Sequence, residues 1–304
     1  MLFAPASLFP QNKLGYLFPE RITKVTDAYP EQSPDGKKIL FQSNRFGNWD
    51  IFTVNIDGTG LQQLTTDSLN EVTPKWSPDG TQIVYCIDVD TVNSDIYLMN
   101  ADGSNKKRLT TFPGDDSHPN WSPDGKRIIF NSAQNTPDYH LPWPRQRIEV
   151  FTMNIDGSDK KQITNLKTIS TYPSFSPDGK YIVFRSVIEQ PSLNWDLSAA
   201  KRNSEIFVMN ADGSGTKNLS ANIAYDGWPS WSPDGEWILF TSNRTGPANI
   251  GQLYTIKKDG TGLRQITNGP GSFIQATWSA GKKIFAHQHW ETEDFGNIVS
   301  FDLE

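Results

Sequence analysis

A repeated tetrapeptide, Ser-Pro-Asp-Gly, constrains the fold of this chain more than any other feature. A degenerate sixth copy, Ser279-Ala280-Gly281, follows five intact copies at a similar spacing. The intact copies begin at Ser33, Ser77, Ser122, Ser176 and Ser232. A period of roughly 45 residues, with insertions in the middle of the chain, is typical of a propeller or another repeat array.

Each copy has the chemistry of a tight hairpin turn. Proline fixes the φ angle of the first central residue, aspartate hydrogen-bonds its own backbone, and glycine adopts a positive φ at little cost. A second turn signal, Asp-Gly, predicts a later hairpin in each of the first five units. It occurs at Asp57-Gly58, Asp102-Gly103, Asp156-Gly157, Asp212-Gly213 and Asp259-Gly260.

The segments between the turns have the pattern of strands that are buried on both faces. Consecutive apolar residues fill them, as in Ile39-Leu40-Phe41, whereas a strand with one wet face would alternate. The aromatic residue before most turn serines, such as Trp121, is expected in the core between blades. Four strands fit in each unit, and blades packed around an axis bury both faces. We therefore predict an all-β chain that forms a six-bladed β-propeller of four-stranded blades.

The two ends of the chain predict how the ring closes. The last unit lacks a fourth strand, and Lys24-Val25-Thr26 matches the fourth strand of other units, such as Gln63-Leu64-Thr65. We expect an N-terminal strand around Arg21 to Thr26 to complete the last blade, which would remove an exposed sheet edge. Residues 21–304 would then form a single propeller, and residues 1–20 an extension that packs on the ring or caps it.

Composition excludes several classes of protein. The 304 residues suffice for one propeller, and 12% aromatic residues support a packed core. A net charge of −6 argues against nucleic-acid binding. The single cysteine, Cys86, excludes a disulfide framework, and no apolar run is long enough for a membrane span. We expect a monomer, which is cytoplasmic if the chain is complete and periplasmic if an export signal was trimmed.

The repeat resembles the TolB-type propeller family. The resemblance rests on the turn at 121–126, the apolar strand after it, the Ile-Tyr/Phe-x-Met-Asn strand and the Asp-Gly turn, and it covers the chain from about residue 21. TolB is a periplasmic protein-binding propeller that follows a separate α/β domain, and we expect a lone propeller here. Related peptidases need a Gly-x-Ser-x-Gly motif, which this sequence lacks. Related oligogalacturonate lyases hold a metal ion with histidine and glutamine side chains.

Candidate binding residues fall mainly on the rim opposite the Ser-Pro-Asp-Gly turns. The loops of this rim vary in length and include insertions at 132–147 and 187–204, and variable loops on a rigid scaffold commonly carry binding sites. Their aromatic and arginine residues are typical of protein hot spots. The candidates for partner binding are Trp49, Tyr139, His140, Trp143, Arg145, Trp195, Trp228 and Trp290. The candidates for the channel lining are Glu31, Glu71, Asp116, His118, Tyr172 and Asp226.

All four histidines map to this variable rim or its approach. His287 and His289 are two residues apart on one predicted strand, so they would face the same side and could share a metal ion. His118 and His140 are the other two candidates for a divalent cation in the funnel. The alternative is that position 287 is simply the solvent-exposed end of a strand, because other units also have a polar residue there.

Two functional hypotheses follow from these features. The first is a non-enzymatic propeller scaffold that binds a protein or peptide partner on the variable rim and in the central funnel. The second is a metal-assisted carbohydrate-active enzyme similar to oligogalacturonate lyase, or a small-ligand receptor, that uses the funnel histidines. The missing nucleophile motif and the scattered histidines favour the first hypothesis.

Overall fold

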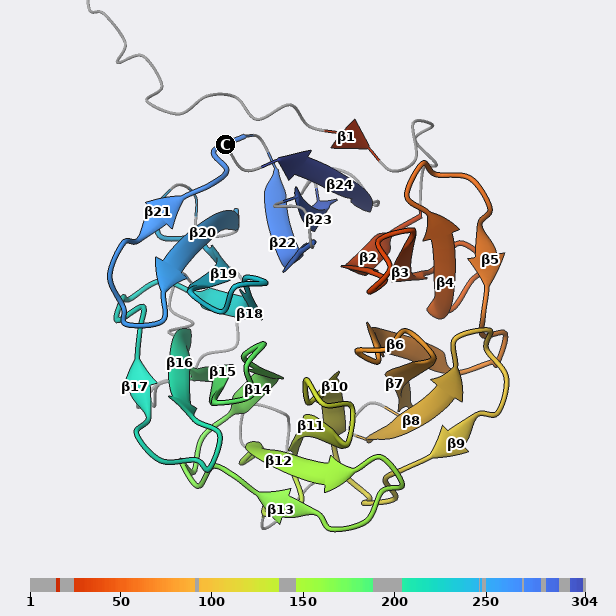
Figure 1. Cartoon of the computed structure of the whole chain (residues 1–304), viewed down its shortest axis with the longest axis horizontal. Helices are drawn as coiled ribbons and strands as arrows, with labels where there is room; N and C mark the ends of the chain where they lie inside the picture. The colour runs from red at the N-terminus through yellow and green to blue at the C-terminus, as the bar shows by residue number, and fades with distance from the viewer. Residues whose placement is uncertain are drawn as a thin grey trace, which may run out of the picture.

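Six antiparallel sheets of four strands each stand around a central axis in the computed structural model (Figure 1). The structure describes residues 15–16, 25–90, 93–136, 146–187, 204–245, 247, 250–269, 271–279, 283–289 and 296–302. Within these ranges, no segment forms a helix of the length and apolarity that crossing a bilayer requires. This arrangement confirms the predicted six-bladed β-propeller.

The first three blades follow the chain from the inside of the ring outwards. Blade 1 contains β2 (Asp27–Gln32), β3 (Lys38–Ser43), β4 (Asp50–Asn55) and β5 (Gln62–Gln63). Blade 2 contains β6 (Asn70–Trp76), β7 (Gln82–Asp88), β8 (Ser94–Asn100) and β9 (Lys107–Arg108). Blade 3 contains β10 (Asp116–Trp121), β11 (Arg127–Ser132), β12 (Glu149–Asn154) and β13 (Lys161–Gln162).

The other three blades repeat this order, except that the last one borrows its outer strand. Blade 4 contains β14 (Ser170–Phe175), β15 (Tyr181–Val187), β16 (Ser204–Asn210) and β17 (Lys217–Asn218). Blade 5 contains β18 (Asp226–Trp231), β19 (Trp237–Ser242), β20 (Gln252–Lys257) and β21 (Arg264–Gln265). Blade 6 contains β22 (Ser272–Trp278), β23 (Lys283–His289), β24 (Gly296–Asp302) and, as its outer strand, β1 (Gly15–Tyr16).

The ring closes through the N-terminal segment, as predicted, but with different residues. Gly15 pairs with Ser300 and Tyr16 with Val299, so the closing strand lies several residues before the predicted Arg21–Thr26. Thr26 contacts blade 6 through an isolated parallel bridge to Gly296, and its other backbone bonds are to Asn44. The physical reason for the error is that a two-residue strand carries no hydrophobic pattern, so a short motif match can assign it to the wrong segment.

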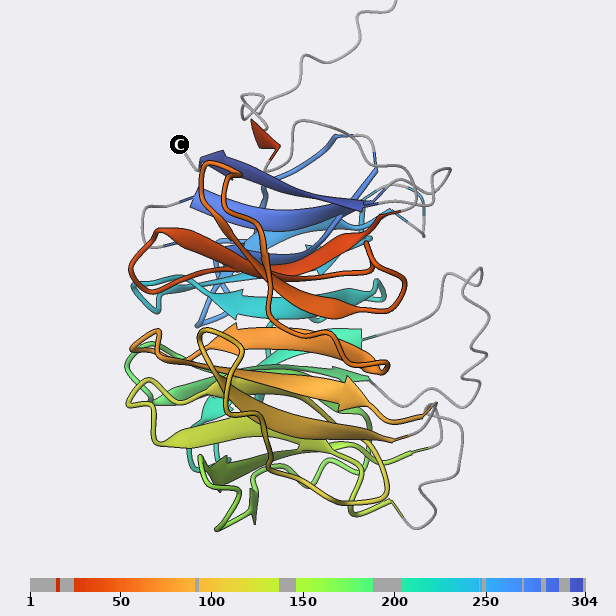
Figure 2. The same cartoon turned by 90° about the vertical axis from the view of Figure 1, so that its right-hand side faces the viewer.

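The Ser-Pro-Asp-Gly segments join the first and second strands of their blades, as predicted. In blade 1 the Gly36 amide donates to the Ser33 carbonyl (2.8 Å), and Gly36 has a φ of +74°. The Ser33 hydroxyl donates to Asp35 (2.6 Å) and accepts from the Lys38 amide (2.9 Å). Because these bonds are local, each copy folds the same hairpin. In the side view of Figure 2 the strand ends form two opposite rims, one with these turns and one with the variable loops.

The core lies between neighbouring blades. The middle strands are buried on both faces, and Ile39, Leu40 and Phe41 have no exposed surface at all. One apolar cluster joins Val84 and Ile96 of blade 2 to Ile128 of blade 3. Since every blade is packed on both sides, the ring is a rigid frame for the strands that line its axis.

Candidate functional site

A β-bulge interrupts the innermost strand of every blade at the same position. The pairing between the first and second strands shifts register there, for example between Ser117 and Asn120 in blade 3. The bulged residue has a φ between +50° and +55° in all six blades; these residues are Tyr29, Thr73, His118, Tyr172, Trp228 and Gln275. A proline follows five of them, and because proline cannot donate to the ladder it favours such an interruption.

The bulged residues bring six side chains together at the axis, where they form the floor of a pocket. The hydroxyls of Tyr29 and Tyr172, from opposite blades, lie 3.3 Å apart. The His118 ring lies 3.8 Å from the Tyr172 ring, centre to centre, and the Trp228 ring lies 6.0 Å from it. The Tyr29 amide donates to Gln275 at 3.3 Å. Burial raises the pKa of both tyrosines, so their hydroxyls stay protonated near neutral pH.

Above this floor is a cavity of about 340 Å³ that opens toward the Ser-Pro-Asp-Gly turns. Its wall is formed by six residues, each two positions after a bulged residue: Glu31, Lys75, Asn120, Ser174, Ser230 and Thr277. Its mouth carries the aromatic side chains Trp121, Phe175, Trp231 and Trp278, and the turn prolines Pro123 and Pro177. These aromatic residues also pack between blades, as predicted for that position. For example, the Trp121 indole donates to the Lys75 carbonyl of the preceding blade (3.2 Å).

One ion pair carries the charge of this cavity wall. The ammonium of Lys75 lies 3.5 Å from Glu31 Oε1, and Glu31 Oε2 accepts the Trp76 amide (2.7 Å). Burial raises the pKa of Glu31, while Lys75 acts in the opposite direction. The two charges cancel, and the rest of the described lining is neutral. The cavity therefore suits a largely uncharged ligand with apolar and hydrogen-bonding groups.

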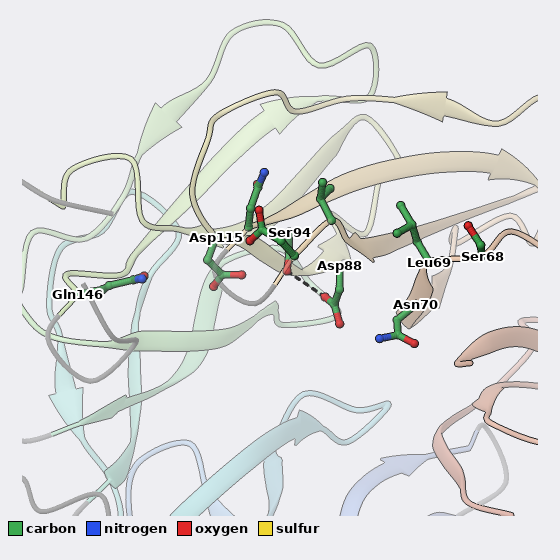
Figure 3. A pocket seen from close by; sticks show the side chains of 10 residues that line it. Ser68, Leu69, Asn70, Asp88, Ser94, Asp115 and Gln146 are labelled. Carbon is green, nitrogen blue, oxygen red and sulfur yellow. Dashed lines mark hydrogen bonds between the residues drawn. The ribbon is translucent and has the colours of Figure 1, made fainter. Parts of the chain in front are cut away.

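A second hollow, of about 610 Å³, lies on the variable rim between blades 2 and 3 (Figure 3). Asp88 and Asp115 flank Ser94 there, and the Ser94 hydroxyl donates to Asp88 (2.9 Å). Burial raises the pKa of Asp115 to about 7, and the charges of Asp116 and Asp88 add to the rise. The described lining is polar and acidic, with Leu69 and Val89 as its apolar part.

Three carboxylates that we expected along the channel are buried between the blades instead. Glu71 and Asp226 have no exposed surface, and Asp116 is 2% exposed. Asp226 is paired with Arg244 (2.8 Å). Burial raises the pKa of Glu71 to about 8, with a contribution from the charges of Asp67 and Asp50, and it raises the pKa of Asp116 to about 6. Of the other channel candidates, Glu31, His118 and Tyr172 do line the axial cavity.

The described histidines do not meet at one point. His118 belongs to blade 3, whereas His287 and His289 belong to blade 6, on the opposite side of the ring. The rings of His287 and His289 lie 5.9 Å apart, and His287 is buried, which lowers its pKa to about 3. The described residues contain no cluster of three or more histidine, cysteine or carboxylate side chains that could hold a metal ion. His140 lies outside the described residues.

The partner-binding candidates of the variable rim are described only in part. Trp49 is half-buried, and its backbone bonds to Asn70 and Glu71 of the next blade. Trp228 lies at the floor of the axial cavity and not on the variable rim. The remaining candidates lie outside the described residues: Tyr139, His140, Trp143, Arg145, Trp195 and Trp290. Their role on this rim stays a prediction.

Sequence reasoning missed the six-fold bulge and the floor that it builds. A signal was present, because a proline stands three residues before each intact turn serine: Pro30, Pro74, Pro119, Pro173 and Pro229. A proline inside an expected strand predicts a bulge or an edge. The residue before it is the floor residue in each of these blades.

Comparison with known proteins agrees with this geometry. The ring of six four-stranded blades around an axial cavity defines a six-bladed β-propeller. The model of the TolB β-propeller domain matches residues 70–138 and 193–304, more than half of the chain, so the chain belongs to that family. The TolB homolog of Chlorobaculum tepidum is 30% identical over 124 residues, which are 40% of this chain and 25% of that protein. This chain thus matches only a quarter of the length of that relative.

Solved structures show the same fold at lower sequence identity. A putative TolB from Agrobacterium tumefaciens has a TM-score of 0.65 at 20% identity, over 91% of both chains. Oligogalacturonate lyase in complex with manganese has a TM-score of 0.60 at 14% identity, over 96% of this chain and 93% of that one. At these identities the likeness concerns the fold alone.

Proposed function

We propose that this propeller is a binding module whose axial cavity holds a short extended segment of a partner protein. The observation that carries the proposal is the cavity itself, a dead-end space of about 340 Å³ with an aromatic and proline-rich mouth. Aromatic-lined grooves are a common means of holding extended, proline-rich segments. Tryptophan and tyrosine supply most of the binding energy in many protein interfaces.

The shape of the cavity also limits what can enter. Since the Tyr29–Tyr172 contact spans the axis, a chain cannot thread through the ring at that level. The ligand would be a chain end or the tip of a loop that enters from the rim with the Ser-Pro-Asp-Gly turns. The likeness to TolB, a protein-binding propeller, favours a protein partner over a small molecule. The variable rim, on the opposite side of the ring, would be a separate contact surface for a protein partner, with Trp143 and Trp195 as its anchors.

A peptide library tests the proposal without a known partner. We would pan random heptapeptides displayed on phage against the wild-type protein and against Ser230→Trp, which fills the cavity from its wall. A matched control is Lys126→Trp, which adds the same side chain at an exposed turn position on the same rim. We expect selected peptides to bind the wild type and the control but not the filled variant. Peptides that bind all three equally well would overturn the cavity as the site.

A further inference from the structure

Two unused hydrogen-bonding groups of the axial cavity lie close together on one strand, β10 of blade 3. His118 and Asn120 both line the cavity, one at its floor and one in its wall. They stand on either side of Pro119, and the bulge between Ser117 and Asn120 is what turns both toward the axis. The inference drawn from them rests on the proposed function, because it concerns what the cavity ligand carries at its tip.

Neighbouring side chains fix the tautomer of His118. The Asn131 amide donates from Nδ2 to the Ser117 hydroxyl (2.8 Å), and Ser117 donates to Asp115 (2.9 Å). Asn131 Oδ1 therefore faces His118 Nδ1, at 2.9 Å, and accepts a hydrogen bond from it. The Ser117 oxygen, whose own proton is directed at Asp115, lies 3.1 Å from the same nitrogen and is a second acceptor for it. The proton of the neutral ring sits on Nδ1, which leaves Nε2 with a free lone pair. This nitrogen has no partner among the described residues.

The ring stays neutral over the physiological pH range. Burial lowers the pKa of His118 to about 4, and the positive charge of Arg185 nearby acts in the same direction, against the Asn131 bond. A neutral ring with a proton on Nδ1 can only accept at Nε2. The floor of the cavity thus offers one hydrogen-bond acceptor of fixed direction.

Asn120 offers the complementary donor. The Trp121 amide donates to Asn120 Oδ1 (2.8 Å), which fixes the orientation of the side-chain amide. Its Nδ2 group, with two N–H donors, has no partner within the described part of the chain. An acceptor and a donor two residues apart thus face the same cavity.

Several of the equivalent positions in other blades are already engaged. Tyr29 and Tyr172 bond to each other, and Glu31 is held by Lys75 and the Trp76 amide. In blade 6, Gln275 Oε1 accepts the Tyr29 amide at 3.3 Å and lies 3.3 Å from His287 Nδ1. The hydroxyl of Thr277 donates to the Pro30 carbonyl at 2.7 Å. Thr73 Oγ1 and Trp228 Nε1 of the floor also lack a hydrogen-bond partner among the described residues, but only blade 3 places an imidazole acceptor and an amide donor at these two positions.

We infer that His118 Nε2 and Asn120 Nδ2 bind one amide group at the tip of the cavity ligand, accepting its N–H and donating to its carbonyl. An amide is the common neutral group of proteins that carries both a donor and an acceptor. It also suits a cavity whose only described charges cancel. The amide can come from the main chain of the partner or from an asparagine or glutamine side chain.

Three small amides of related shape test this inference by NMR. N-methylacetamide carries one N–H and one carbonyl, as the main chain does, and acetamide mimics a side-chain amide. N,N-dimethylacetamide keeps the carbonyl but has no N–H. We expect one of the first two to shift the His118 Nε2 and Asn120 Nδ2 resonances and to bind at least about fivefold more tightly than N,N-dimethylacetamide. The stronger of the two identifies the source of the amide.

Two conservative variants separate recognition from structure. Asn120→Asp keeps an acceptor for the Trp121 amide and removes only the donor, and His118→Phe keeps a ring against Tyr172. Each should weaken binding of the preferred amide about fivefold, while Ser158→Ala, in an exposed turn of blade 3 outside the cavity, should not. Equal binding of N,N-dimethylacetamide, or wild-type affinity in both variants, would overturn the inference. If the peptides selected on the cavity still bind in that case, the proposed function stands and only the amide assignment is lost.

Discussion

The hydroxyls of Tyr29 and Tyr172 lie 3.3 Å apart across the ring, although 143 residues separate them in the sequence. Each side chain reaches the axis because a β-bulge with a positive φ turns it inward. The contact joins blade 1 to blade 4 and closes the floor of the axial cavity. The same pair of residues therefore serves the stability of the ring and the shape of the candidate site.

This contact predicts a coupling between two distant positions. Tyr29→Phe and Tyr172→Phe each remove one hydroxyl but keep the ring that packs in the floor. We expect each variant to lose about 1 kcal/mol of unfolding free energy, and the double variant to lose less than the sum. Denaturant unfolding of the four proteins measures this. Fully additive losses would mean that the two hydroxyls do not bond to each other.

In the buried ion pair of blade 5, removing one charge should cost much more unfolding free energy than removing both. Arg244 bonds to Asp226 at 2.8 Å, and both side chains are almost fully buried. Arg244→Met leaves the carboxylate without its partner, which should cost about 3 kcal/mol of unfolding free energy. The double variant Asp226→Asn with Arg244→Met should recover much of this loss, since it removes both charges.

An exposed pair provides the control for this prediction. Lys258 lies 2.7 Å from Glu236 on the surface, where solvent screens the attraction. Lys258→Met should change stability little. A loss in Lys258→Met as large as the one in Arg244→Met would show that burial does not set the strength of these pairs. Guanidinium unfolding measures these losses, because a shift of the midpoint at an unchanged slope of free energy against denaturant reports a change in stability.

The blade pattern could be predicted from the sequence. The direction in which individual side chains of the inner strands point could not. Turn residues and apolar runs define strands locally, so five intact turns were enough to place six blades. The bulge adds one residue to each inner strand, which changes which side chains face the axis. Lys75 and Glu71 lie on the same strand, yet Lys75 lines the cavity and Glu71 is buried between blades. A simple alternation of faces does not distinguish them.

The buried position of Glu71 predicts a pH-dependent stability. Its pKa is about 8 in the folded protein, because of burial and then the charges of Asp67 and Asp50, against an ordinary value of 4.5. The folded state therefore keeps a proton that the unfolded chain releases, so stability falls as pH rises from about 5 to about 8. We expect a loss on the order of 2 kcal/mol over this range. Asp115 and Asp116, whose pKa values are raised to about 7 and about 6, contribute with the same sign.

Glu71→Gln isolates this effect. Glutamine imitates the protonated acid and carries no charge at any pH, so the variant should match the wild type at pH 5 and exceed it at pH 8.5. Unfolding free energies across this pH range, with Glu236→Gln as a surface control, check the sign. A variant that is less stable than the wild type at pH 8.5 would contradict the assignment of a buried, protonated Glu71.

The closing strand gives the last prediction. Gly15 and Tyr16 cover the outer edge of β24, although the sequence had indicated residues around Arg21. Deleting residues 1–17 removes β1, whereas deleting residues 1–13 leaves it in place, so the two truncations differ only in the strand. Because the outer edge of blade 6 is then bare, we expect the longer deletion to lower the melting temperature by about 2–8 °C relative to the shorter one. The ring should still melt in one transition, since its blades share their cores. Equal melting temperatures for the two truncations would mean that a segment after residue 17 closes the ring, as the original motif match had predicted.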